Sequence, residues 1–182
     1  VDNFNLAAFN PCYGLAEATV GVSAKAHPEQ PARFWHLNRQ ALGNGLVEEA
    51  ESGSEDCQTL VSVGRLWHTQ EMRIVDVASG AILGDRQVGE IQLRSASVAQ
   101  GYWSLDDDSV FGSDGFLRTG DLGFQQDGEL VITGRLKDLI IIHGRNYWPQ
   151  DLELRIESIP SVRAGCAIAI QEEGSVEIIA EV

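Results

Sequence analysis

Residues 117–153 read LRTGDLGFQQDGELVITGRLKDLIIIHGRNYWPQDLE and hold two short polar clusters, RTGD at 118–121 and GRLKD at 134–138. The Asp127-Gly128 pair between them predicts the turn of a β-hairpin, with LVIT as the returning strand. Polar side chains beside glycines at strand ends are where a rigid scaffold commonly presents binding groups. The stretch therefore predicts a β scaffold that carries a binding site.

The residues after this hairpin predict a small second domain. The aliphatic run at 139–142 predicts a buried strand, and Pro149 and Pro160 bracket a predicted helix whose apolar residues recur at helical spacing. The stretches GCAIAI and VEIIAEV predict two further strands. This β-α-β-β order indicates a second domain that begins at Lys137.

The residues before the hairpin are mainly of β type. TLVSVG, MRIVDV and VGEIQLR are short runs bounded by glycines, the alternation in EIQLR predicts a half-buried strand, and ASG at 78–80 predicts a hairpin turn. Residues 25–58 instead predict a surface excursion, with a short element around FWHLNRQAL and a solvated acidic loop. The whole pattern predicts an α+β fold rich in strands.

The composition is that of a globular, acidic chain. Its 182 residues are 43% hydrophobic and carry a formal net charge of -14, so the chain can bury a core but lacks the basic face that nucleic acids or anionic membranes require. The three cysteines form no CxxC pair, which indicates reduced thiols in a cytoplasmic protein. No apolar run approaches the ~20 residues of a membrane span.

Both ends of the sequence predict an internal fragment. The chain starts without Met on VDNFNLAAFNPCYG and stops at VEIIAEV, inside a predicted strand. A strand that ends in this way leaves ladder groups unpaired, which natural domains usually avoid.

Four side chains suggest nucleotide chemistry when they are considered one by one. Asp121 follows a glycine, so its carboxylate can be exposed in a turn, where it suits the vicinal diol of a ribose. Arg135 could hold the same sugar or a phosphate. Glu17 suits a nucleotide-bound Mg²⁺, and Tyr13 offers a flat face for a purine. Each pattern taken singly is also typical of an ordinary turn, a solvated carboxylate or a core tyrosine. The three carboxylates at 106–108 cannot all face one ion from an extended chain, so we expect no metal there.

Taken in order, YGLAEAT, LRTGDLG and GRLKDLIIIHGRN resemble the adenylate-forming superfamily of acyl-CoA synthetases, luciferase and nonribosomal-peptide adenylation domains. These sequence motifs are most similar to those of the fatty acyl-AMP ligases. Ala16 and Thr19 match the ligase version of the first motif, and Lys137 stands at the hinge position that amino-acid adenylation domains fill with Asp. Residues 33–58 fall where these ligases carry an insertion. The resemblance covers essentially the whole chain.

The resemblance implies a fold in two parts. Residues 1–136 would form the β-rich, distorted barrel-like end of the large AMP-binding domain, with the insertion at about 33–58. Residues 137–182 would form the hinge and the beginning of the small α/β C-terminal domain. Lys137 and Arg135 would be the catalytic residues. The full set of implied roles is Tyr13 and Ile132 against the adenine, Gly14, Leu15 and Ala16 beside the nucleotide and acyl group, Glu17 on Mg²⁺, Asp121 on the ribose hydroxyls, Arg135 on the ribose and phosphate, and Lys137 as the hinge.

The implied reaction has two steps. A fatty acid attacks the α-phosphate of ATP to give an acyl-adenylate (acyl-AMP), and the acyl group then passes to the phosphopantetheine thiol of an acyl carrier protein. In the family the insertion is thought to restrict rotation of the small domain and to disfavour coenzyme A, so we expect its deletion to permit coenzyme A ligation.

Two family elements have no counterpart in the 182 residues, the Ser/Thr/Gly-rich phosphate loop and the catalytic lysine near the C-terminus. We therefore expect the chain to depend on the rest of its own polypeptide and to be inactive, or nearly so, by itself. Two alternatives stay open, a long-chain acyl-CoA synthetase and a non-catalytic nucleotide-binding or interaction module.

Overall fold

The computed structural model describes residues 5–103, 110–142, 145–172 and 175–182. Its contacts divide into two compact units, Val1–Thr133 and Gly134–Val182, and each unit is described by itself. The acidic run at 106–108 lies outside the described residues. The assignment of residues 1–136 and 137–182 to two functional domains stays a prediction.

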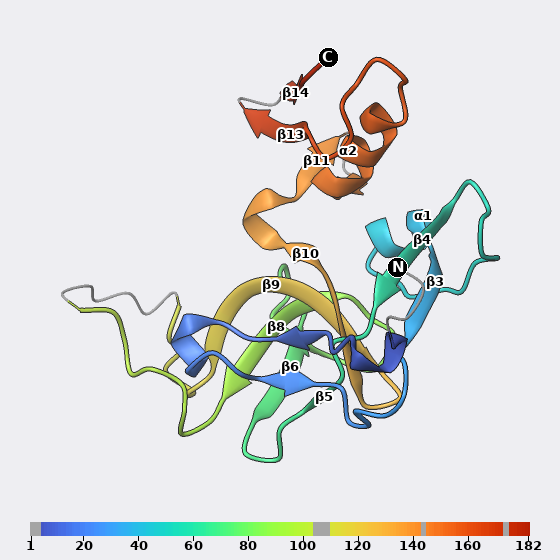
Figure 1. Ribbon diagram of the computed structural model, residues 1–182. Coiled ribbons are helices and arrows are strands. Elements are labelled where there is room, and N and C mark those ends of the chain that lie inside the picture. Colours follow the sequence, from blue (N-terminus) through green and yellow to red (C-terminus); the bar gives the residue numbers. More distant parts are fainter. Residues whose placement is uncertain (1–4, 104–109, 143–144, 173–174) are drawn as a thin grey trace. The chain divides into compact units, whose positions relative to one another are not determined.

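A five-stranded sheet with the order β10-β9-β8-β6-β7 dominates the first unit, and its long strand β9 is strongly curved (Figure 1). Asp127 and Gly128 connect β9 to β10 with φ angles of 55° and 75°, the left-handed geometry of a tight hairpin turn, as predicted. The predicted turn at residues 78–80 joins β6 to β7. The strands are β6 (Glu71–Val75), β7 (Ile82–Leu83), β8 (Gly89–Arg94), β9 (Leu117–Gln126) and β10 (Glu129–Arg135).

Two smaller sheets and three short helices complete this unit. The first sheet has the order β1-β2-β5, and the second pairs β3 with β4. Asn38 ends β3, and its side-chain oxygen accepts a hydrogen bond of 2.9 Å from the N–H of Ala41, which starts the helix α1. The bounds are η1 (Leu6–Ala8), β1 (Cys12–Tyr13), η2 (Ala16–Ala18), β2 (Ser23–Ala24), β3 (Phe34–Asn38), α1 (Arg39–Gly43), β4 (Cys57–Val61) and β5 (Arg65–Leu66).

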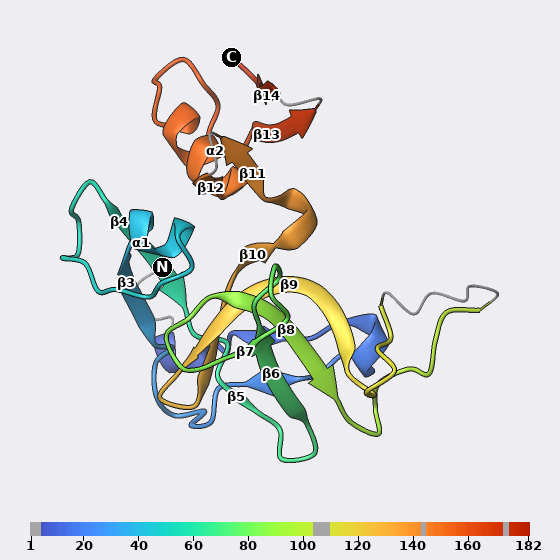
Figure 2. The same ribbon diagram turned by 180° about the vertical axis from the view of Figure 1, so that it is seen from behind.

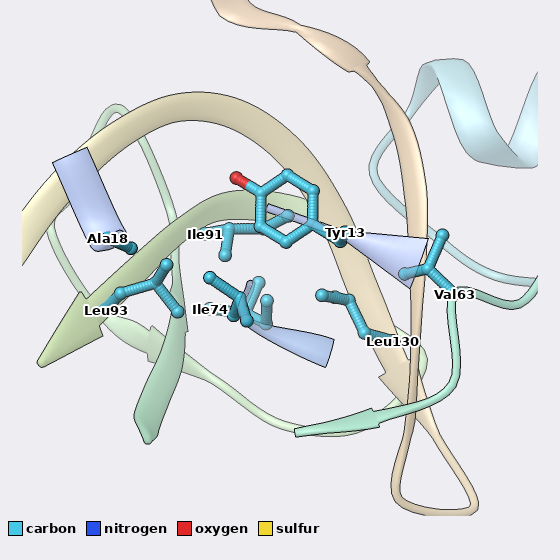
Figure 3. Close-up of a cluster of buried hydrophobic side chains, with 8 residues drawn as sticks. Tyr13, Ala18, Val63, Ile74, Ile91, Leu93 and Leu130 are labelled. Atoms are coloured by element: carbon cyan, nitrogen blue, oxygen red, sulfur yellow. The ribbon is translucent and has the colours of Figure 1, made fainter. Parts of the chain in front are cut away.

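Two buried clusters hold the first unit together. The first cluster joins the β1-β2-β5 sheet to strands of the large sheet (Figure 3), and the second joins the excursion at 25–58 to β9 and β10. Burial of one large aliphatic or aromatic side chain contributes roughly 1.5–3 kcal/mol, so the second cluster fastens the excursion firmly. Its members are Trp35, Leu37, Leu42, Val47, Phe124 and Val131.

The excursion is therefore only partly the surface feature that the sequence predicts. Its acidic end is exposed at every residue from 51 to 56, as expected. Trp35, Leu37 and Leu42, in contrast, are 7%, 0% and 1% exposed and belong to the core. The glycines and prolines of this segment suggested a loop, but its apolar residues pack against β9 and β10, which lie far along the chain.

The described residues of the second unit form a short 3-10 helix, one α-helix and two antiparallel strand pairs, β11 with β12 and β13 with β14 (Figure 2). Two carboxylates of the helix accept hydrogen bonds from the β13 backbone, Glu153 from Ala169 N–H at 3.0 Å and Glu157 from Ala167 N–H at 3.1 Å. The predicted helix between Pro149 and Pro160 and the two last strands are confirmed. The elements are η3 (Leu136–Asp138), β11 (Ile140–Ile142), β12 (Arg145–Tyr147), α2 (Pro149–Glu157), β13 (Ala167–Glu172) and β14 (Ser175–Ala180).

Two sequence predictions about burial are wrong. Ile141 in β11 is 53% exposed, so this strand is not buried on both faces. Gln92 in β8 is only 4% exposed, although its position in EIQLR predicts a solvent-facing side chain. Arg73 on the neighbouring strand β6 and Glu90 on β8 itself form hydrogen bonds with the Gln92 amide, and the partner on β6 is invisible to a local pattern.

Three general features of the chain complete the comparison with the sequence. The described elements are mostly strands with short helices, which confirms a β-rich α+β fold. All three cysteines are free thiols. Among the described helices, none has the length and apolar character needed to cross a membrane.

Candidate functional site

The RTGD cluster lies within β9, at an irregularity in its pairing with β8. Gln92 pairs with Arg118 and Glu90 pairs with Leu122, so the three residues 119–121 stand opposite the single residue Ile91. Such a bulge turns side chains away from the regular alternation of a strand and is common beside active sites. The sequence predicted a turn here, whereas the structure has a bulged strand.

The bulge is held by side-chain hydrogen bonds to the backbone. The Thr119 hydroxyl donates to the carbonyl of Ile91 at 2.7 Å and accepts from the N–H of Asp121 at 3.1 Å. Gly120 adopts a φ of +69°, which a residue with a side chain rarely takes. The left-handed backbone of Gly120 and the two hydrogen bonds of the Thr119 hydroxyl therefore stabilise the bulge, and together they place Asp121.

Asp121 and Tyr13 form a buried pair between two motifs that lie far apart in the sequence. The Tyr13 hydroxyl donates to a carboxylate oxygen of Asp121 at 2.6 Å, and the two residues are 9% and 6% exposed. The expectation that Asp121 is exposed is wrong, because the bulge directs it inward. A carboxylate with two oxygens can accept several hydrogen bonds, so Tyr13 need not be the sole hydrogen-bond donor to Asp121.

Tyr13 and Ile132, expected against the adenine, share one environment with Leu15, expected near the nucleotide and acyl group. Leu15 and Ile132 are partly buried and pack against the first core cluster, which includes Tyr13. The Tyr13 ring itself points into this cluster, among Ile91 and Leu130 (Figure 3). Tyr13 is thus a core residue with one polar contact.

The first motif forms a compact turn that only glycine permits at one position. A Cβ on Gly14 would lie 1.4 Å from the carbonyl oxygen of Val20, so any side chain there would force the turn open. Thr19 and Val20 have positive φ angles of 56° and 73°, and the Thr19 hydroxyl donates to the carbonyl of Ser97 at 2.8 Å. This turn presents Gly14 and Ala16 at the surface.

Glu17 lies on η2, directly after the Ala16 position, and is half-buried. The Tyr102 hydroxyl donates to its Oε1 at 2.5 Å, and its backbone carbonyl accepts from Ala99 N–H at 2.7 Å. Mg²⁺ in nucleotide sites is often held by one or two carboxylates together with phosphate oxygens and waters, so this single oriented carboxylate fits such an ion. Among the described residues, no group of three or more His, Cys, Asp and Glu side chains forms a metal cage.

Arg135 and Lys137 belong to the second unit, and both are exposed. Lys137 stands on η3 and lines a hollow of about 500 Å³ together with Pro149, Glu153 and Ala169. The structure therefore brings Tyr13, Leu15, Asp121 and Ile132 together in one unit. The roles predicted for Arg135 and Lys137 stay predictions.

Sequence reasoning missed a polar chain that ends at the bulge. Glu90 Oε1 accepts from the N–H of Gly120 at 3.2 Å, and Glu90 Oε2 accepts from Gln92 Nε2 at 2.8 Å. Arg73 donates to the Gln92 carbonyl oxygen from Nε and Nη2 at 2.9 and 2.7 Å, and it forms an ion pair with Asp114. The hydrogen bond from Arg73, followed by backbone hydrogen bonding at Phe116, lowers the pKa of Asp114. The polar residues of EIQLR were the only signal, and they fitted a solvent-facing edge equally well.

Comparison with known proteins places the chain in a family. The sequence profile of the family described as AMP-binding enzyme matches residues 3–103. A 4-hydroxyphenylalkanoate adenylyltransferase of Mycobacterium marinum is 41% identical over 97% of this chain and 30% of its own length. The medium-chain-fatty-acid–[acyl-carrier-protein] ligase JamA of Moorena producens is 41% identical over 97% of this chain and 32% of its own length.

A solved structure agrees with these relatives. It comes from studies of fatty acyl-adenylate ligases from E. coli and L. pneumophila, and it superposes with a TM-score of 0.87 at 33% identity. The superposition covers 99% of this chain and 33% of that protein. The chain thus spans about a third of the length of the proteins it matches.

Proposed function

Because this chain belongs to the AMP-binding enzyme family, we propose that it is the nucleoside-binding part of a fatty acyl-AMP ligase. The parent enzyme would activate a fatty acid with ATP to an acyl-adenylate and pass the acyl group to the phosphopantetheine thiol of an acyl carrier protein. The observation that supports this most directly is the buried pair of Tyr13 and Asp121, which joins the YGLAE and RTGD motifs at 2.6 Å.

Asp121 would accept the ribose hydroxyls. Its carboxylate is fixed by Tyr13 and by the bulge, so binding a diol costs little ordering of the side chain. Ile132 would supply an apolar contact to the adenine at the edge of the first core cluster. Gly14 and Ala16, at the surface of the first turn, would let the nucleotide approach the backbone closely.

Glu17 would hold Mg²⁺, which neutralises phosphate charge when it is bound. The hydrogen bond from Tyr102 orients the Glu17 carboxylate before any ligand arrives. Arg135 would contact the ribose and phosphate, and Lys137 would be the hinge of the small domain. Both side chains are exposed, which suits a residue that meets a ligand and a residue at which a domain turns.

The choice of acyl acceptor can be tested by shortening the excursion at 25–58, and the structure shows which part of it can be removed. Removing all of residues 33–58 would delete β3, the first two residues of β4 and four of the six buried residues of the second core cluster, so the deletion that the resemblance suggests would leave Phe124 of β9 without most of its packing partners. Shortening the exposed loop at 51–56 spares that core. In the parent enzyme we expect this shorter deletion to admit coenzyme A as acceptor. Unchanged acceptor choice would contradict a restraining role for the loop.

Nucleotide binding by the 182-residue chain is the direct test of the proposal. Titration with AMP, followed by ¹H–¹⁵N NMR, should shift the amides of Tyr13, Asp121 and Ile132 with an affinity on the order of millimolar. Asp121→Ala should abolish those shifts, whereas Asp76→Ala, a half-buried carboxylate in the turn between β6 and β7, should leave them intact. A wild-type chain that gives no shifts at these residues with AMP would refute the proposal.

A further inference from the structure

The bulge in β9 creates a backbone donor that the sheet itself does not satisfy. Residues 119–121 stand opposite Ile91 alone, so the N–H of Gly120 has no regular ladder partner. This N–H donates to Glu90 Oε1 at 3.2 Å. A buried or half-buried N–H without a partner costs about as much as a lost hydrogen bond, so Glu90 stabilises the bulged conformation over a regular strand.

Glu90 is itself held in place from the other side. Its second oxygen accepts from Gln92 Nε2 at 2.8 Å, and Gln92 is 4% exposed. Arg73 fixes the orientation of the Gln92 amide, because a guanidinium only donates and both of its contacts go to Gln92 Oε1. Arg73 is in turn placed by its ion pair with Asp114 and by the Phe116 ring, whose centroid lies 4.0 Å from the guanidinium carbon.

We propose that Glu90 is a positioning residue for nucleoside binding. Through Gly120 it fixes the bulge, and the bulge directs the Asp121 carboxylate toward Tyr13 and the ribose. Gln92 and Arg73 set the direction of the Glu90 carboxylate, so these side chains act as one unit. The nucleoside part of this inference rests on the proposed function, while the part about the bulge does not.

The hydrogen-bond directions make the proposal sharply testable. Glu90 accepts at both oxygens, one from Gly120 and one from Gln92. In Glu90→Gln one of these acceptors becomes an NH₂ group, and it must face either the Gly120 N–H or the Gln92 NH₂. The double variant Glu90→Gln with Gln92→Glu reverses the middle bond. The new carboxylate at 92 accepts from Arg73 and from the amide at 90, whose oxygen again faces Gly120.

The experiment compares the wild type, Glu90→Gln, the exchanged double variant and Glu71→Gln in AMP titrations followed by NMR. Glu71 is the matched control, because it is a carboxylate of the same sheet that accepts a hydrogen bond from Arg94 and lies on β6 rather than on either strand of the bulge. We expect Glu90→Gln to move the Gly120 amide proton upfield and to weaken AMP binding about fivefold to tenfold. The exchanged variant should restore both readings, and Glu71→Gln should change neither.

Unchanged AMP affinity in Glu90→Gln would overturn the positioning role. Failure of the exchanged variant to restore the Gly120 signal, with the remaining amides in native positions, would overturn the role of Gln92 and Arg73. If the wild-type chain itself does not bind AMP, the proposed function fails. In that case the Gly120 amide proton shift in Glu90→Gln still tests whether Glu90 stabilises the bulge.

Discussion

At the scale of single residues, the site depends on a phenol and a carboxylate that are both withdrawn from water. Tyr13 donates to Asp121 at 2.6 Å in the first core cluster, where hydrogen bonds are stronger than at the surface and unpaired groups are costly. The pair therefore serves stability and function together, since it holds two motifs 108 positions apart in the sequence.

Tyr13→Phe should lower the free energy of unfolding by about 1–3 kcal/mol, because Asp121 loses a donor in a buried place. Urea unfolding monitored by circular dichroism measures the change. Tyr102→Phe is the control, since Tyr102 also donates to a carboxylate, Glu17, but from an exposed position. We expect less than about 0.5 kcal/mol there. Equal losses in the two variants would show that burial of the Tyr13 pair is unimportant.

Asp76 provides a pH-dependent contribution at the turn between β6 and β7. Its Oδ1 accepts from the Ser79 hydroxyl at 2.6 Å and from the Ser79 N–H at 2.7 Å. These hydrogen bonds, that of the hydroxyl first, lower the pKa of Asp76 below its ordinary value. A carboxyl whose pKa is lower in the folded chain stabilises the fold above its unfolded pKa, near about 4, and loses that contribution as the pH falls.

Ser79→Ala should therefore destabilise the chain at pH 6 and converge with the wild type as the pH falls well below about 4. The difference in urea midpoint across this range is the measurement. Ser54→Ala, in the exposed acidic loop, should show no pH-dependent difference. If the difference in urea midpoint between Ser79→Ala and the wild type is as large well below pH 4 as at pH 6, the charge of the Asp76 carboxylate does not stabilise the turn.

At the scale of elements, the fold rests on close approaches of strands that only glycine allows. A Cβ on Gly123 in β9 would lie 2.5 Å from the carbonyl oxygen of Val131, on the β10 backbone. It would also lie 3.0 Å from the Ile91 side chain. A backbone oxygen cannot rotate away as a side chain can, so the strands must separate to admit even a methyl group.

Gly123→Ala should accordingly cost roughly 1–3 kcal/mol in unfolding free energy. Gly84→Ala is a suitable control, because its nearest neighbour is the end of the Gln87 side chain at 3.8 Å. Thermal and urea unfolding of the two variants decide the point. If Gly123→Ala is as stable as Gly84→Ala, the distance between β9 and β10 is not what limits this position.

The elements that follow from local pattern were predicted correctly, and those that depend on distant partners were not. The Asp127-Gly128 turn and the helix bracketed by Pro149 and Pro160 are determined by residues that are close together in the sequence. The bulge is not, because two extra residues in β9 have meaning only against the register of β8. For the same reason Asp121 was predicted at the surface although the structure buries it. The motif residues were found by resemblance, and Glu90 was missed because its partner is a backbone N–H 30 positions away.

At the scale of the whole molecule, we expect the chain to bind nucleotide without catalysing the activation of a fatty acid. The chain spans about a third of the length of its relatives and contains the Tyr13–Asp121 pair and the oriented Glu17. Acid activation by ATP needs cations placed around the transferred phosphate, where charge develops in the transition state. The phosphate loop and the C-terminal lysine that the family uses for this purpose have no counterpart in the 182 residues, so nucleotide recognition is the property we expect the chain to retain.

The chain alone should therefore bind AMP without catalysing fatty-acid-dependent exchange between ATP and pyrophosphate. Loss of even one preorganised charge-stabilising group typically lowers turnover by about 10²–10³-fold, and here both the phosphate loop and the C-terminal lysine of the family have no counterpart. Radiolabelled pyrophosphate exchange, with the full-length ligase JamA as the positive control, measures the difference. Supplying the remaining two-thirds of the parent enzyme on the same polypeptide should restore exchange, and Asp121→Ala should abolish it again. Robust exchange by the 182 residues alone would show that the motifs described here are sufficient for acid activation.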